Sequence, residues 1–178
     1  TDNGQQLKGL ASQLIEPAWR TRCPGFVICP QCPEGSSWDQ QLPAMISLLE
    51  FWRQDTRVDR SRIYITGLSL GGFGTWRFAA AKPDYFAAAV PICGGGNPET
   101  ASTLVRLPIW AIHGSDDKVI PVAESLRMIA AIKAIGGNPR FTELAGVGHD
   151  SWTESYSNPN GVLAWMYQQI NDRCDGCR

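Results

Sequence analysis

Short apolar runs alternate along the chain with stretches in which apolar residues recur at helical spacing. Continuous apolar or β-branched runs, bounded by turn residues, predict strands at 25–30, 62–67, 86–94, 107–114 and 140–144. Helical spacing predicts helices at 41–55, from Gly74 to about Pro83, between Pro121 and Gly136, and at 160–170. Strands that alternate with helices form a mostly parallel sheet with helices on both faces. The pattern therefore predicts an α/β protein, whose sites form at the carboxyl ends of the strands.

The composition is that of one globular domain. The chain has 178 residues and a hydrophobic fraction of 43%, enough for a sizeable core. Its 16 basic and 17 acidic residues leave a formal charge of −1. Because nucleic acids and anionic membrane surfaces bind basic patches, neither is expected as a partner. No apolar run reaches the roughly 20 residues of a membrane helix, and the polar start TDNGQQLKGL is unlike a signal peptide.

Six cysteines include two C-x-x-C pairs, CPQC at 29–32 and CDGC at 174–177. This spacing suits zinc or redox chemistry. The two pairs lie far apart in the sequence, unlike those of a zinc ribbon, and a proline follows Cys32 directly. A disulfide somewhere in the chain is the competing interpretation. Cys29 and Cys93 are interpreted as small buried hydrophobic residues at strand ends.

The segment YITGLSLGGFGTW (64–76) holds a candidate nucleophile, Ser69. It contains the pattern G-x-S-x-G, placed after a predicted strand and before a predicted helix. A catalytic motif of this kind needs a sharp turn, and a Cβ at either flanking glycine, Gly67 or Gly71, is expected to collide with the neighbouring helix or strand. The helix N-terminus would point N–H groups at the serine oxygen, and the N–H of Leu70 is placed to donate to an oxyanion. A purely structural turn is the alternative.

A serine hydroxyl needs a base, and the chain has only two histidines. Where the motif is catalytic, the order along the chain is serine, acid, histidine. His149, in GVGHDSW, follows every candidate acid, so we interpret the strand-end His113 as structural, with its ring hydrogen-bonded to the following turn. In SDDKVIP, Asp117 is the preferred acid and Asp116 a turn cap. Asp150, beside His149, is interpreted as solvated or as a local cap.

Three separated segments together resemble the α/β-hydrolase superfamily: RIYITGLSLGGFGTW with FAAAVPICGGGNP, HGSDDKVIPV, and GVGHDSW. The resemblance runs from about Phe26 to His149. It is to the phospholipase/carboxylesterase and dienelactone-hydrolase-like serine esterases, with kinship to prolyl-oligopeptidase catalytic domains. It implies an α/β-hydrolase fold and no metal or organic cofactor. The roles that it implies are nucleophile for Ser69, acid for Asp117, base for His149 and oxyanion donor for Leu70.

One element of that family pattern does not occur before Phe26. In such esterases a strand ending in His-Gly-Gly or His-Gly-Ala supplies a second oxyanion N–H, and TDNGQQLKGL resembles the residues after its loop. In the family's sheet this strand lies between those predicted at 25–30 and 62–67. We therefore expect 1–178 to be a single domain, incomplete at its N-terminus, unless another segment or subunit fills the gap or the flanking strands pair directly. Exposed strand edges favour association into a homo-oligomer.

The resemblance implies a serine hydrolase that cleaves carboxylic esters through an acyl-enzyme on Ser69. The near-zero charge and the absence of a long hydrophobic lid segment favour a small soluble ester as substrate, with a short acyl chain or an aryl group. Trp38, Phe73 and Trp152 are candidate walls of the substrate pocket, with core packing as the alternative for each. A peptidase or thioesterase with the same triad, and a non-catalytic hydrolase-like module, are the alternative functions.

Overall fold

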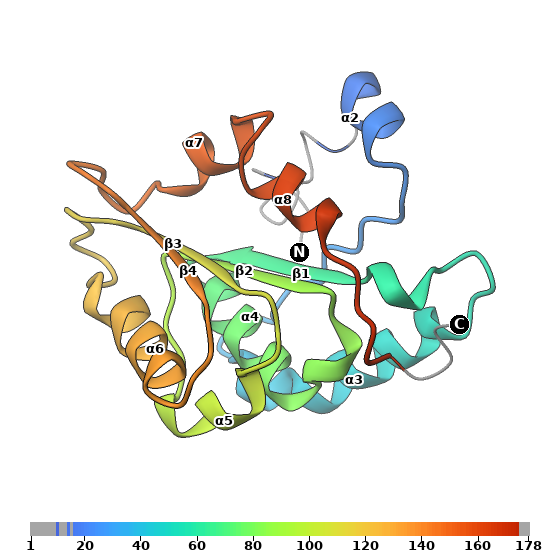
Figure 1. The fold of residues 1–178 in the computed structure, drawn as a ribbon, viewed down its shortest axis with the longest axis horizontal. Helices are drawn as coiled ribbons and strands as arrows, with labels where there is room; N and C mark the ends of the chain where they lie inside the picture. The colour runs from blue at the N-terminus through green and yellow to red at the C-terminus, as the bar shows by residue number, and fades with distance from the viewer. Residues whose placement is uncertain (1–9, 11–13, 15, 175–178) are drawn as a thin grey trace.

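A parallel sheet forms the centre of the structure, a computed structural model that describes residues 10, 14 and 16–174 (Figure 1). Its four strands follow the chain order β1-β2-β3-β4. Because all pairs are parallel, the carboxyl ends of the strands meet at one edge of the sheet. The strands are β1 (Tyr64–Leu68), β2 (Ala88–Ile92), β3 (Trp110–Gly114) and β4 (Arg140–Leu144).

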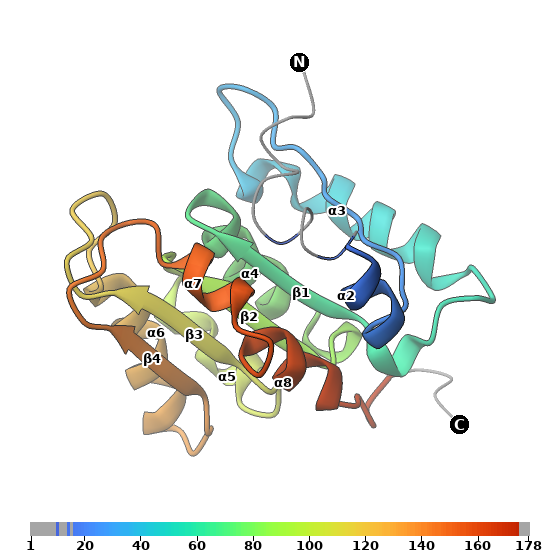
Figure 2. The same cartoon turned by 90° about the horizontal axis from the view of Figure 1, so that it is seen from above.

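Helices cover both faces of this sheet, as the sequence pattern predicts (Figures 1 and 2). One face carries α3 (Trp38–Arg53), α4 (Leu70–Ala81), α5 (Ala101–Leu104) and α6 (Ala123–Ala134). The other face carries α7 (Trp152–Ser157) and α8 (Val162–Gln168), with α2 (Pro17–Arg22) on the same side. Three short 3₁₀ helices, Arg60–Arg62, Pro83–Tyr85 and Pro98–Thr100, lie in the connections. The predicted α/β fold class is therefore confirmed.

Alternate residues of the central strands contribute to two separate cores. Ala89 and Ala111 face the cluster under α4, α5 and α6, whereas Val90 and Ile112 face the cluster under α7 and α8. Successive side chains of a strand point to opposite faces, so a strand covered on both sides is apolar throughout. Every residue of β2 is accordingly buried.

The prediction of a strand at 25–30 is wrong. These residues form no strand, and Phe26, Val27 and Ile28 are 49%, 45% and 41% exposed. The Phe26 ring instead contacts Trp52 of α3, with ring centroids 5.2 Å apart. A strand needs a hydrogen-bonded neighbour, and continuity of apolar residues does not specify one. Direct pairing between 25–30 and 62–67 is not found, and no strand of the described segment pairs with the outer edge of β1.

Helix α3 begins at Trp38, three residues before the predicted start, because Ser37 caps it. The Ser37 hydroxyl accepts a hydrogen bond from the Gln40 N–H at 3.4 Å, and the Gln40 side chain accepts one from the Ser37 N–H at 3.0 Å. This reciprocal pair satisfies two N–H groups that a helix start leaves without partners. Helix α4 likewise begins earlier than predicted, at Leu70, directly after Ser69.

The cysteines do not form a zinc-ribbon arrangement in the part of the chain described. Cys23, Cys29, Cys32 and Cys93 are free thiols, whereas Cys174 is disulfide-bonded. Cys177 lies outside the described residues. Within those residues no helix combines the length and the apolar character needed to cross a membrane.

Replacement of Phe86 tests the core beneath α4. Phe86 is 1% exposed, so Phe86→Ala leaves a cavity and should lower the free energy of unfolding by about 3–5 kcal/mol. Phe51→Ala is the matched control, because Phe51 is 67% exposed and its loss should cost about 0.5 kcal/mol or less. Urea unfolding followed by circular dichroism measures both. Equal losses would show that the core assignment is wrong.

Candidate active site

Ser69 occupies a strained turn between β1 and α4. Its φ and ψ are 52° and −118°, a conformation that residues with side chains rarely adopt. The Ser69 N–H donates to the carbonyl of Ile92 at the end of β2, at 3.0 Å. The turn is thereby tied to the neighbouring strand, and it holds the serine at the carboxyl edge of the sheet.

Glycines allow the close approach of α4 to the strands, but only some of the expected positions require one. A Cβ on Gly67 would lie 2.4 Å from the Gly71 carbonyl oxygen, and one on Gly72 would lie 2.5 Å from the Ile92 carbonyl oxygen. A Cβ on Gly71 would meet nothing within 4 Å, so the expectation of a collision there is wrong. The helix turns away from the strand at Gly71, whereas Gly72 faces the backbone of β2.

Ser69, His149 and Asp117 form one chain of hydrogen bonds. His149, in the loop between β4 and α7, places Nε2 2.9 Å from the Ser69 hydroxyl. Its Nδ1 lies 2.7 Å from Oδ2 of Asp117, which is in the loop between β3 and α6. A carboxylate oxygen only accepts, so Nδ1 carries the imidazole proton and Nε2 is free to accept the proton of the serine hydroxyl. The side chain of His149 is 22% exposed, so the chain opens to solvent at this point.

The Asp117 carboxylate is buried and fully hydrogen-bonded. Its second oxygen, Oδ1, accepts from the N–H groups of Val119 and Ile120 at 2.8 and 2.9 Å. Burial raises the pKa of the Asp117 carboxyl, but the hydrogen bonds from His149, Ile120 and Val119 outweigh it and hold the pKa below its usual value. Asp117 is therefore ionised at neutral pH.

The two other acidic candidates lie outside this chain. Asp116 is exposed and accepts a hydrogen bond from the Ser115 hydroxyl at 2.9 Å, as a turn residue does. Asp150 accepts from the Thr153 N–H at 3.1 Å at the start of α7. The contact of Asp150 with a backbone N–H agrees with its interpretation as a local cap, whereas Asp116 contacts a side-chain hydroxyl and its role as a turn cap stays a prediction.

His113 lies on the far side of Asp117 and is fully buried. Its Nε2 is 2.9 Å from the carbonyl oxygen of Ile120, so the ring contacts the following turn as expected. The same nitrogen is also 3.3 Å from Asp117 Oδ2. Sequence reasoning missed this contact, although a histidine at a strand end four residues before the acid is a usable signal. Asp117 is therefore held between two imidazole rings.

Cys93, directly after β2, is a second buried neighbour that the sequence did not connect with the site. Its backbone has a φ of 40°, and its Sγ accepts from the Ser69 N–H at 3.3 Å. Cys93, Asp117 and His149 each bring one potential metal-ligating atom within 4.8 Å of the others. However, burial raises the pKa of the Cys93 thiol to about 11, and the other two residues are hydrogen-bonded to each other. The hydrogen bonds that join Asp117, His149 and Ser69 suit proton transfer.

Leu70 is the first residue of α4. The first N–H groups of a helix have no partner within it, and Leu70 directly follows Ser69. The Leu70 side chain is 51% exposed. The oxyanion role of Leu70 stays a prediction.

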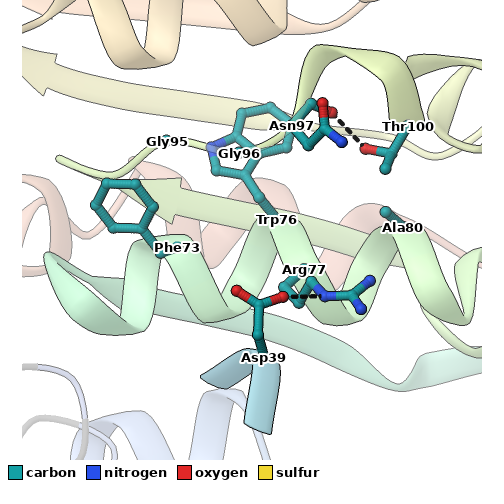
Figure 3. A pocket seen from close by; sticks show the side chains of 9 residues that line it. All are labelled: Asp39, Phe73, Trp76, Arg77, Ala80, Gly95, Gly96, Asn97 and Thr100. Atoms are coloured by element: carbon teal, nitrogen blue, oxygen red, sulfur yellow. Dashed lines mark hydrogen bonds and ion pairs between the residues drawn. The ribbon is translucent and has the colours of Figure 1, made fainter. Parts of the chain in front are cut away.

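A pocket of about 360 Å³ runs along α4 (Figure 3). Phe73, one of the three predicted pocket residues, lines it and lies one helical turn after Ser69. Figure 3 shows the ion pair between Asp39 and Arg77 on one side and the loop from Gly95 on the other. The lining residues are Asp39, Phe73, Trp76, Arg77, Ala80, Gly95, Gly96, Asn97 and Thr100.

The two predicted pocket tryptophans lie elsewhere. Trp38 packs against α4, where a Cβ on Gly74 would be 2.7 Å from its ring, and it meets the Phe78 ring edge-on. Trp152 meets the His149 ring edge-on, with centroids 5.5 Å apart. The structure therefore places Trp152 beside the hydrogen-bonded chain and Trp38 between two helices.

A parallel sheet with a serine at a strained strand-to-helix turn, followed by an acid and a histidine on later loops, is the α/β-hydrolase fold. Comparison with known proteins narrows the class. The sequence profile of the dienelactone hydrolase family matches residues 35–164. The chain therefore belongs to the dienelactone hydrolase family.

Individual relatives agree with this family. A crystal structure of a thermostable esterase superposes with a TM-score of 0.87 and 34% identity, over 96% of this chain and 51% of that one. Esterase YpfH of Escherichia coli is 26% identical over 113 residues, 62% of this chain and 48% of that protein. The bifunctional acetylxylan esterase/xylanase XynS20E of Neocallimastix patriciarum is 31% identical over 103 residues, 54% of this chain and 15% of that protein. The chain thus spans about half, or less, of each of these relatives.

Two neighbouring glycines provide a matched test of the turn. Gly72→Ala forces a Cβ into the backbone of β2 and should cost about 1–3 kcal/mol of unfolding free energy or more. Gly71→Ala meets no obstacle and should change stability by less than about 1 kcal/mol, with a gain favoured by helix propensity. Thermal and urea unfolding of both variants measure the difference. Similar stabilities would contradict the described packing.

Asp117 should make stability depend on acid pH. Its pKa is lower in the folded chain than the ordinary value of 3.8, so its contribution is complete above that value and is lost as pH falls through the folded pKa. Asp117→Asn should therefore be less stable than the parent chain at neutral pH, and the gap should narrow steadily below about pH 4. Urea unfolding of both chains across the acid range measures the gap. A gap that is constant with pH would contradict an ionised, hydrogen-bonded Asp117.

Proposed function

We propose that the chain is a serine hydrolase that cleaves carboxylic esters. The observation that carries this proposal is the continuous hydrogen-bonded chain from Ser69 through His149 to the buried Asp117. Membership of the dienelactone hydrolase family and similarity to a thermostable esterase support it. A non-catalytic module would gain nothing from a strained serine, an aligned imidazole and a buried carboxylate, because each costs folding free energy.

The reaction begins with attack of the Ser69 hydroxyl oxygen on the ester carbonyl. His149 Nε2 accepts the serine proton during the attack, and the ionised Asp117 stabilises the imidazolium that forms. The same imidazolium then protonates the leaving alcohol, and an acyl-enzyme remains on Ser69. Water activated by His149 hydrolyses this ester by the reverse roles. Asp117 keeps its negative charge throughout, which fixes the tautomer of His149 in both half-reactions.

The tetrahedral intermediate carries an oxyanion that needs hydrogen-bond donors. The Leu70 N–H, at the positive end of α4, supplies one donor. Loss of one such donor typically costs about 10²–10³ in rate, so a second donor is needed for full activity.

A small ester with a short acyl chain or an aryl group is the substrate class that fits best. The XynS20E relative is named as a bifunctional acetylxylan esterase/xylanase, and acetyl is a short acyl group. The aromatic edge of Trp152 beside His149, and Phe73 one turn after Ser69, offer apolar contacts near the serine.

Replacement of Ser69 tests the reaction directly. Ser69→Ala should lower hydrolysis of p-nitrophenyl acetate by at least about 10³-fold and abolish the single mass adduct formed with a fluorophosphonate. Ser102→Ala, at an exposed serine of α5, is the control and should keep both. An adduct that persists in Ser69→Ala would place the nucleophile elsewhere.

The same assay separates the substrate classes. The parent chain should hydrolyse p-nitrophenyl acetate faster than the palmitate ester or a peptide p-nitroanilide. Preference for the anilide would favour a peptidase. A folded sample with neither activity nor adduct would contradict catalysis by this chain.

A further inference from the structure

We propose that His113 is a buried imidazolium that positions Asp117 and limits the proton affinity of His149. Three polar atoms surround the two ring nitrogens of His113. Nδ1 is 2.8 Å from the hydroxyl oxygen of Ser125 on α6, and Nε2 faces the Ile120 carbonyl oxygen at 2.9 Å and Asp117 Oδ2 at 3.3 Å. His113 and Ser125 are both 0% exposed, so neither side chain contacts bulk solvent.

The single proton of the Ser125 hydroxyl decides the state of Nδ1. The Ser125 hydroxyl donates to the carbonyl oxygen of Gly94 at 2.8 Å. A hydroxyl has one proton, so it cannot also donate to His113. Nδ1 must therefore be the donor, with the serine oxygen as its acceptor. If Nδ1 carried no proton, the Ser125 hydroxyl would have to donate its hydrogen bond to the ring. The Ser125 and Gly94 oxygens would then lie 2.8 Å apart with no proton between them.

Nε2 must carry a proton as well. Both of its neighbours, the Ile120 carbonyl oxygen and Asp117 Oδ2, are acceptors only. The Nε2–H donates to the Ile120 carbonyl oxygen, and Asp117 Oδ2 lies beside it at ion-pair distance. A ring with protons on both nitrogens is the imidazolium, and its charge is paired with the buried Asp117 carboxylate, as a buried cation requires.

The other titratable groups on the described elements that pack against His113 are exposed, paired or neutral. On β4 its register partner is Glu143, which is exposed, and on α6 the residue beside Ser125 is Glu124, which pairs with Arg127 at the surface. At the end of β2, Cys93 is a protonated thiol, because burial raises its pKa to about 11. On the remaining side lies Asp117, whose other partner is His149.

The consequence for catalysis rests on the proposed function. Asp117 Oδ2 serves two imidazole rings, at 2.7 Å and 3.3 Å. The positive charge on His113 offsets part of the carboxylate charge that would otherwise hold a proton on His149. His149 therefore stays neutral, and able to accept the Ser69 proton, at a lower pH than it would beside Asp117 alone. His113 acts through Asp117 and is a positioning residue.

Two histidines in the whole chain make the protonation state directly measurable. In a His149→Ala variant with ¹⁵N-labelled histidine, His113 is the only imidazole in the NMR spectrum. Both ring nitrogens should bear protons at pH 7.5, with no signal of the unprotonated type. If His149→Ala does not fold, the parent chain phosphonylated on Ser69 provides the same spectrum with two assignable rings. A single unprotonated nitrogen on His113 at this pH would overturn the proposal.

Kinetics then test the positioning role. His113→Gln keeps a donor toward Ile120 without the charge, and Ser125→Ala removes the acceptor that keeps Nδ1 protonated. In both variants the acid limb of the kcat/KM profile should move up by about 0.5–1 pH unit, about three- to tenfold in proton affinity. Ser155→Ala is the matched control at another buried serine and should not move the limb. Lower activity with an unmoved limb in both test variants would overturn the proposal. Complete inactivity of the parent chain would instead contradict the proposed function, and the NMR result would still stand.

Discussion

One buried carboxylate connects the parts of the site. Asp117 accepts hydrogen bonds from the backbone of its own loop through one oxygen and contacts two imidazole rings through the other. A charge without partners would be costly in this position, so every partner of Asp117 contributes to keeping it ionised. The loop after β3, the loop after β4 and the end of β3 itself are held in one arrangement by this single group.

The backbone around Ser69 provides the second constraint. The serine can point out of the sheet edge only because α4 begins against the end of β2, and the spacing there leaves no room for a Cβ at Gly72. A Cβ on Gly94, in the segment after β2, would likewise lie only 2.6 Å from the carbonyl carbon of Gly72. The Gly94 carbonyl also accepts the Ser125 hydroxyl that contacts His113. The strained turn and the buried carboxylate are thus connected through one short segment after β2.

The sequence could predict the convergence of Ser69, Asp117 and His149, because each follows a predicted strand and parallel strands end at one edge. The contact of His113 with Asp117 was missed, because the strand-end position four residues before the acid signals proximity but the contact itself depends on how far the following turn folds back. The run at 25–30 has the composition of a buried strand, but composition does not supply a pairing partner, and Phe26 packs on α3 instead. Trp38 could not be placed from composition either, since an aromatic ring fits a pocket wall and a helix interface equally well.

The protonation state of the Cys93 thiol determines how it reacts with electrophiles. A thiolate reacts with alkylating agents and peroxides, whereas a neutral thiol is nearly inert. The Cys93 sulfur lies 3.3 Å from the Ser69 nitrogen, yet it is buried, and its pKa is raised to about 11. Sulfur and oxygen nucleophiles thus sit side by side with opposite reactivities. Burial thus keeps the Cys93 sulfur in its protonated, weakly nucleophilic form beside the backbone of Ser69.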